Sequence, residues 1–184
     1  LEQVLDACIG QQIHLALDLC TGSGAIALVL AKELGCQVVA SDLSEAALQV
    51  ARHNIRHQGF AERITPVASD LFSGLQPAFD LIVSNPPYIV EAEIDTLQPE
   101  VARAEPRLAL SGGGDGLDSI RRIIAAAPAY LRPGGWLFME IGADQQQTVG
   151  ALLHDAGHSF DHSDILLDYA GRPRVARARR ATRP

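Results

Sequence analysis

Cysteine and lysine are scarce in this sequence, and the two shortages exclude different classes of protein. Three cysteines lie far apart among the 184 residues, and Lys32 is the one lysine. An odd number of widely spaced cysteines does not suit a disulfide framework or a metal site, and it is typical of free thiols in a reducing compartment. Histidines at helical spacing, His53 with His57 and His154 with His158, have no carboxylate or cysteine in sequence to complete a ligand set. We therefore expect a cytoplasmic protein without a metal centre.

Long hydrophobic runs are also missing. No stretch approaches the roughly 18 apolar residues of a transmembrane helix, and the start, Leu1-Glu2-Gln3, lacks the basic region of a signal peptide. The composition is nevertheless 47% hydrophobic, which is enough for a core. Since no repeat or low-complexity linker divides the chain, we expect one domain over residues 1–184 and no membrane partner. Since Met is absent at position 1, we expect either a trimmed chain or a start that lies ahead of the given residues.

The net charge is −7 and is unevenly distributed. Residues 171–184 hold six of the 15 basic residues and no acid, so the rest of the chain has nine basic against 22 acidic residues. An enzyme that binds a nucleic-acid duplex needs lysine and arginine to neutralise phosphates. The acidic body therefore argues against nucleic acid as a direct substrate and favours a basic protein partner. The arginine-rich end is typical of a last strand that frays into solvent.

Apolar runs alternate with helical segments along most of the chain. We expect strands over residues 13–19, 37–41, 64–68, 79–84, 136–141, 159–167 and 174–178. We expect helices over residues 1–10, 25–34, 45–58, 117–131 and 144–156. This order predicts an α/β fold with a seven-stranded, mostly parallel sheet, a terminal antiparallel hairpin and helices on both faces. Residues 89–116 are rich in Glu, Pro and Gly, and we interpret them as a substrate-side flap, partly helical near residues 99–104.

The motif Asn85-Pro86-Pro87-Tyr88 follows the predicted strand 79–84 directly. Two prolines stop a strand and fix a rigid loop at its carboxyl end, where open α/β sheets place their chemistry. The Asn85 side-chain carbonyl and a proline carbonyl are two acceptors, and Tyr88 is a flat aromatic face. Together they suit a planar group that carries an NH₂. Taken alone, the motif fits a proline-rich turn with a packed tyrosine equally well.

A glycine-rich turn follows the first predicted strand. Residues 18–24 read Asp-Leu-Cys-Thr-Gly-Ser-Gly, and a helical segment begins at Ala25. Such a turn lets the backbone approach a ligand closely, and the helix N-terminus presents free N–H groups to a carboxylate. Residues 22–27 also match the loose G-x-G-x-x-A pattern, so a dinucleotide fold remains an alternative at this point.

Carboxylates lie at three predicted strand ends. Asp42 fits a dinucleotide as well, whereas Asp18 and Asp70 favour S-adenosylmethionine (SAM). Asp18 precedes the glycine turn, where it can orient a cationic amino-acid group. Asp42 follows the second predicted strand and is either a ribose ligand or a second helix cap beside Ser44. Asp70 follows the third and suits an adenine, although an aspartate after a strand is also a common turn residue.

In their order and spacing, residues 18–24, Asp42, Asp70 and residues 85–88 resemble the class I, Rossmann-like SAM-dependent methyltransferases that methylate amino groups. More narrowly, the chain resembles the catalytic domain of the release-factor glutamine N5-methyltransferases. Further segments follow that family's pattern: residues 105–110, 112–117, 121–123, 140–142 and 171–174. The resemblance runs from about Asp18 nearly to the C-terminus. Members of that family carry a helical domain ahead of this one, which we expect to be missing here.

The resemblance implies roles for the motif residues. Residues implied in binding SAM are Asp18, Cys20, Thr21, Gly22, Ser23, Gly24, Asp42, Leu43, Asp70, Leu71 and Asn85. Residues implied in catalysis are Asn85, Pro86, Pro87 and Tyr88. Cys20 departs from the pattern, because the family usually has glycine there. Since cysteine does not readily adopt φ > 0, we expect the loop to take a slightly different path.

The implied reaction is methyl transfer from SAM to the side-chain amide nitrogen of a glutamine in a translation release factor. Glutamine methylation of a ribosomal protein is a close variant, and N6-adenine methylation of nucleic acid is a rival that fits the same pocket. A module that binds a nucleotide or SAM without catalysis is a rival from a different class.

Overall fold

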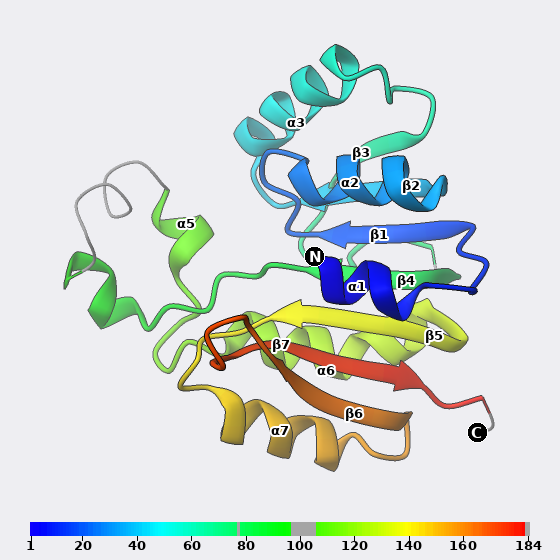
Figure 1. Ribbon diagram of the computed structural model, residues 1–184. Coiled ribbons are helices and arrows are strands. Elements are labelled where there is room, and N and C mark those ends of the chain that lie inside the picture. Colours follow the sequence, from blue (N-terminus) through cyan, green and yellow to red (C-terminus); the bar gives the residue numbers. More distant parts are fainter. Residues whose placement is uncertain (77, 97–105, 183–184) are drawn as a thin grey trace.

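The structure is a computed structural model, which describes residues 1–76, 78–96 and 106–182. Within these residues a seven-stranded sheet has the strand order β3-β2-β1-β4-β5-β7-β6 (Figure 1). The strands are β1 (Leu15–Leu19), β2 (Gln37–Asp42), β3 (Ile64–Ala68), β4 (Phe79–Ser84), β5 (Leu131–Glu140), β6 (Phe160–Leu167) and β7 (Pro173–Arg180). Strands β1 to β5 pair in parallel, whereas β7 is antiparallel to both β5 and β6. The predicted mostly parallel sheet with a terminal hairpin is confirmed.

Helices cover both faces of the sheet, as predicted (Figure 1). One face is covered by α1 (Glu2–Ala7), α2 (Ala25–Leu34) and α3 (Glu45–His57), and the other by α6 (Asp118–Tyr130) and α7 (Gln146–Asp155). Each layer buries its apolar stripe in a separate cluster against the sheet. Ser44 caps α3 as predicted, because its side chain accepts from Ala47 N at 3.2 Å. No helix in the described part of the chain is both long and apolar enough to span a bilayer.

The starts of β1 and β5 differ from their predicted positions by two and five residues, for reasons that lie elsewhere in the chain. β1 begins at Leu15 and not at residue 13, because the Asp80 carboxylate accepts the backbone N–H groups of His14 and Leu15 at 2.8 and 2.9 Å. β5 begins five residues before Trp136. Residues 132–135, which lie between the predicted helix and the predicted strand, belong to β5, and the register of β5 with β4 shifts between Phe79 and Leu81.

The segment that follows the motif of residues 85–88 includes a 3₁₀ helix, η1 (Glu91–Thr96), and a short helix, α5 (Arg107–Leu110). It extends from the end of the molecule at which β1 and β5 terminate (Figure 1). Its base is fixed by backbone hydrogen bonds, among them Gly112 N to Ile89 O at 2.8 Å. The helical turn expected near residues 99–104 lies outside the described residues.

Candidate active site

The glycine-rich turn and the Asn85-Pro86-Pro87-Tyr88 motif start from adjacent points of the sheet. β1 and β4 are parallel neighbours, and their last residues, Leu19 and Ser84, are register partners. The buried Ser84 hydroxyl donates to Leu19 O at 2.8 Å, so the two strand ends are joined by a side chain as well as by the sheet. The structure therefore brings together the two motifs that lie about sixty residues apart in sequence.

Asp18 is buried and organises the glycine-rich turn from below. Its Oδ2 accepts from Thr21 Oγ1 at 2.5 Å and from Ala27 N at 2.9 Å, which ties the turn to the first turn of α2. Its Oδ1 is also buried and has no hydrogen-bond partner among the described groups. A buried acceptor without a donor is costly. This oxygen therefore fits an N–H donor of a ligand, such as the ammonium group of SAM.

Burial raises the pKa of Asp18 from 3.8 to about 6, against the opposing effect of the hydrogen bonds from Thr21 and Ala27. The folded state then binds a proton more tightly than the unfolded state between these two values. The contribution of Asp18 to the free energy of unfolding is expected to fall by roughly 3 kcal/mol as the pH rises from about 4 to about 6. Above about pH 6, this contribution is expected to stay nearly constant. Chemical denaturation at several pH values, compared between wild type and Asp18→Asn, measures this difference. An unchanged slope in the variant contradicts the assignment.

Three residues of the turn adopt left-handed backbone conformations. Gly22 and Gly24 have φ of 55° and 81°, and Cys20 has φ of 63°. The expectation that cysteine avoids φ > 0 and diverts the loop is wrong. Thr21 holds the loop in place from the next position, since its N–H donates to Ser41 O at 2.9 Å and its hydroxyl to Asp18. Cys20 also packs against the apolar cluster beneath it.

The conformation of Cys20 predicts an unusual order of substitutions. Glycine adopts φ > 0 without strain, so Cys20→Gly is expected to change the free energy of unfolding by less than about 1 kcal/mol. A β-branched side chain is strained there, so Cys20→Val is expected to cost about 2 kcal/mol, although valine buries more apolar surface. Urea denaturation of both variants compares them. Equal losses, or a more stable valine variant, rule out a left-handed Cys20.

Asp42 holds the turn from its other side. Its Oδ2 accepts from Gly22 N and its Oδ1 from Ser44 N, both at 2.8 Å. Ser44 is the N-cap of α3, so Asp42 supports the residue that caps the helix and is not a second cap. Its carboxylate is partly exposed and has acceptor positions left over, so the ribose interpretation stays a prediction. The neighbouring Leu43 is 57% exposed and offers an apolar surface beside it.

The predicted adenine residues are placed differently from each other. Asp70 is exposed, and its Oδ2 pairs with Arg122 Nη2 of α6 at 2.9 Å. This hydrogen bond lowers the pKa of Asp70. Leu71 has φ of 50° and is only 8% exposed, so it presents little surface to a ring. Arg122 is a neighbour of the site that its sequence position did not indicate.

The motif of residues 85–88 combines one exposed amide with a supported aromatic ring. Asn85 is exposed, Pro86 is buried, and Pro87 and Tyr88 are half-buried. Tyr88 packs against the apolar cluster on the α6 side, and its hydroxyl donates to Glu140 Oε1 at 3.2 Å. Burial, together with the Glu140 carboxylate, raises the pKa of Tyr88, so the hydroxyl remains a donor at neutral pH.

Gln145 is a structural residue of the site that sequence reasoning missed. The side chain is buried; its Nε2 donates to Tyr88 O at 2.9 Å and to Gly116 O at 3.1 Å, and its Oε1 accepts from Gly142 N at 2.9 Å. Gly116 must approach closely, since a Cβ there would lie 2.5 Å from Tyr88 O. The glycine-rich segment before α6, residues 112–116, therefore packs against the motif of residues 85–88 and is not a phosphate loop. Three consecutive glutamines in the sequence give no signal that the first is buried.

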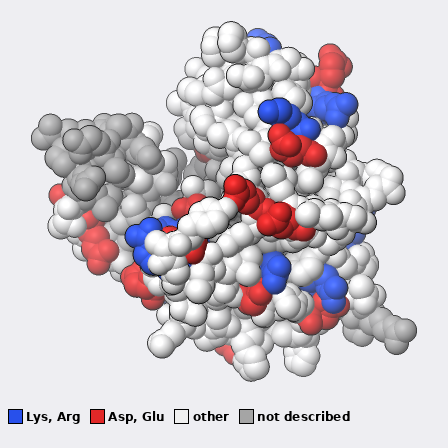
Figure 2. All heavy atoms as spheres, in the orientation of Figure 1, with Lys and Arg blue, Asp and Glu red and all other residues white. Residues whose placement is uncertain are grey.

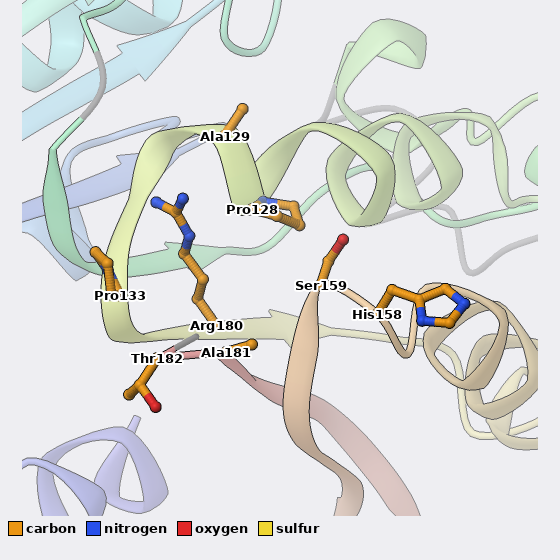
Figure 3. A pocket seen from close by; sticks show the side chains of 8 residues that line it. All are labelled: Pro128, Ala129, Pro133, His158, Ser159, Arg180, Ala181 and Thr182. Atoms are coloured by element: carbon orange, nitrogen blue, oxygen red, sulfur yellow. The ribbon is translucent and has the colours of Figure 1, made fainter. Parts of the chain in front are cut away.

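Two pockets lie at opposite ends of the sheet. A pocket of about 50 Å³ at the carboxyl end is lined by Ile26, Asn85 and Glu140 among others, and so joins the first turn of α2 to the motif. A larger cavity of about 420 Å³ lies where α6 ends and β5 begins (Figure 3). It is lined by Pro128, Ala129, Pro133, His158, Ser159, Arg180, Ala181 and Thr182. None of the predicted site residues borders the larger cavity.

Comparison with known proteins agrees with this geometry. The family model described as "Methyltransferase small domain" matches residues 2–115. A release factor glutamine methyltransferase of Cereibacter sphaeroides is 45% identical over 97% of this chain and 64% of its own length. A ribosomal protein uL3 glutamine methyltransferase of Neisseria meningitidis is 50% identical over 71% of this chain and 43% of its own length.

The solved structures are similar in fold at low sequence identity. A ribosomal protein L11 methylase from Lactobacillus delbrueckii subsp. bulgaricus superposes with a TM-score of 0.70 at 21% identity, over 98% of this chain and 76% of that one. The chain spans about 56 to 64% of the length of the curated release factor methyltransferases it matches. The resemblance inferred from the motifs is confirmed, and the chain belongs to the methyltransferase small domain family.

Proposed function

We propose that the protein transfers a methyl group from SAM to the side-chain amide nitrogen of a glutamine in a peptide chain release factor, in the cytoplasm. The observation that carries this proposal is the junction of the glycine-rich turn with the Asn85-Pro86-Pro87-Tyr88 motif at the ends of β1 and β4, joined by the Ser84 hydroxyl. Relatives named for release factor glutamine methylation support the substrate.

The residues present fit SAM. The unpartnered Oδ1 of Asp18 suits its ammonium group, and the N-terminus of α2 suits its carboxylate. The half-exposed carboxylate of Asp42 suits ribose hydroxyls, with the exposed Leu43 beside it. Asp70 retains one carboxylate oxygen outside its bond to Arg122 for an exocyclic amine. When bound, SAM supplies an electrophilic methyl group.

The protein's own contribution is to orient a poor nucleophile. An amide nitrogen has its lone pair delocalised into its carbonyl. Asn85 Oδ1 and the Pro86 carbonyl each accept one N–H of the glutamine amide, which directs the lone pair and favours the positive charge that develops on nitrogen. Tyr88 packs on the amide plane, and Pro87 holds the shape of the loop. The reaction needs no base beforehand, because the methylated amide loses its proton readily.

Two other substrates are alternatives to the release factor, and the experiment described below tests all three. Glutamine methylation of ribosomal protein uL3 is supported by relatives named for it, at 50% identity. N6-adenine methylation suits the same acceptors, but the acidic body of the chain opposes a nucleic-acid duplex.

The test is mass spectrometry of a release factor, of uL3 and of an oligonucleotide after incubation with the protein and SAM. Addition of one methyl group to a release factor glutamine is expected. Methylation of uL3 or adenine alone overturns the substrate, and tight binding of NAD in place of SAM, measured by calorimetry, overturns the reaction class.

A further inference from the structure

Two segments that matched the family pattern without an implied role meet at the Tyr88 hydroxyl. Glu140 is the last residue of β5, and Arg174 is the second residue of β7. Glu140 Oε1 accepts from the Tyr88 hydroxyl at 3.2 Å and lies 3.9 Å from Arg174 Nη1. Neither charged residue belongs to the motif of residues 85–88.

We propose that Glu140, paired with Arg174, is a positioning residue that fixes the Tyr88 ring as a wall for the target amide. This inference rests on the proposed methyl transfer, and it deepens that function by assigning the segments 140–142 and 171–174 to the acceptor side of the site. Glu140 also lines the same small pocket as Asn85, so the carboxylate lies close to the motif of residues 85–88.

Tyr88 is held at three points. Its ring packs against the apolar cluster on the α6 side, its carbonyl accepts from Gln145 Nε2 at 2.9 Å, and its hydroxyl is bonded to Glu140. A tyrosine side chain has two torsions that place the ring, and anchoring both ends removes this freedom before a substrate arrives. Such pre-organisation lowers the barrier of a reaction that depends on orientation.

The backbone keeps the charged pair in place. Ile141 N donates to Arg174 O at 3.0 Å, and Glu140 is the register partner of Val175. About a third of each charged side chain is exposed, 36% for Glu140 and 30% for Arg174. The arginine thus compensates a partly buried carboxylate, which stays available as an acceptor for the phenol. The terminal hairpin is therefore part of the acceptor site as well as an edge of the sheet.

A double-mutant cycle in the complete protein tests the coupling. Tyr88→Phe and Glu140→Ala each remove the same hydrogen bond, and each is expected to lower kcat roughly 3- to 10-fold with the Kd of SAM unchanged. Tyr88→Phe combined with Glu140→Ala is expected to be no slower than the slower single variant. Asp161→Ala, which removes the 2.8 Å contact to Arg179 elsewhere in the hairpin, is the matched control and leaves kcat unchanged.

Multiplied losses in the double variant, or a weakened Kd of SAM in Glu140→Ala, overturn the proposal. Ultraviolet titration gives a readout that does not need turnover. The pKa of Tyr88, identified by difference from Tyr88→Phe, is expected to fall when Glu140 is replaced by alanine, and an unchanged pKa overturns the contact. A wild-type protein that methylates no glutamine refutes the proposed function, whereas the titration still decides whether Glu140 holds Tyr88.

Discussion

Replacing Asn85 with alanine is expected to lower kcat by about 10²- to 10³-fold, the loss seen when one pre-organised group that stabilises transition-state charge is removed. Asn85 is exposed at the end of β4, so its removal leaves no buried polar group behind and the fold is expected to persist. The Kd of SAM is expected to change little, since Asp18, Asp42 and the turn between them stay in place. Single-turnover methylation of the substrate peptide and calorimetry with SAM measure the two effects separately.

The control for this prediction is Asn54→Ala, which removes the same kind of side chain from a different bond. Asn54 Nδ2 donates to Ser23 O at 2.9 Å and so contacts the turn and not the motif. Any effect is expected in the Kd of SAM, with kcat nearly unchanged. An Asn85→Ala protein with a near-normal rate refutes the role of this residue in orienting the amide.

Gln145→Leu is expected to lower the free energy of unfolding by roughly 2–4 kcal/mol, because it keeps the volume of the side chain and removes its hydrogen bonds. Two carbonyls, of Tyr88 and Gly116, and the N–H of Gly142 are then left without this partner in a buried position. The Tyr88 backbone is also released, so kcat is expected to fall with stability. Urea denaturation with a constant m-value measures the loss.

The chain offers a close control for this substitution. Gln147 lies two residues away in α7 and is exposed. Gln147→Leu is expected to change stability by no more than about 0.5 kcal/mol, as surface substitutions do. Equal losses in the two variants indicate that leucine disturbs α7 generally and that the buried amide is not what holds the site together.

Features with a local cause were predictable from the sequence. The limits of α2, β3 and β4 match because apolar runs and the Gly, Pro and Asp residues around them act on their own neighbours. The cap at Ser44 is local in the same sense. The meeting of the two main motifs followed from a general property of parallel sheets, whose carboxyl ends lie at one edge.

Features with distant partners could not be predicted in this way. Gln145 joins segments that are 57 and 29 residues away, and the Asp70–Arg122 pair spans 52 residues. The left-handed backbone conformation of Cys20 follows from hydrogen bonds made by Thr21, whereas cysteine by itself prefers a negative φ. Segments such as 140–142 and 171–174 could be matched to a family, but only the fold showed that Glu140 bonds Tyr88 and that Arg174 pairs with Glu140.

The hydroxyl bond between Ser84 and Leu19 has an evolutionary consequence. In the proposed reaction, it makes the glycine-rich turn and the motif of residues 85–88 neighbours within one sheet, so their alignment is built into the sheet itself. Choice of target can then diverge in the outlying parts of the chain while the transfer chemistry is inherited unchanged. This separation agrees with the comparisons. Relatives of similar identity to this chain are named for two different translation proteins, a release factor and ribosomal protein uL3.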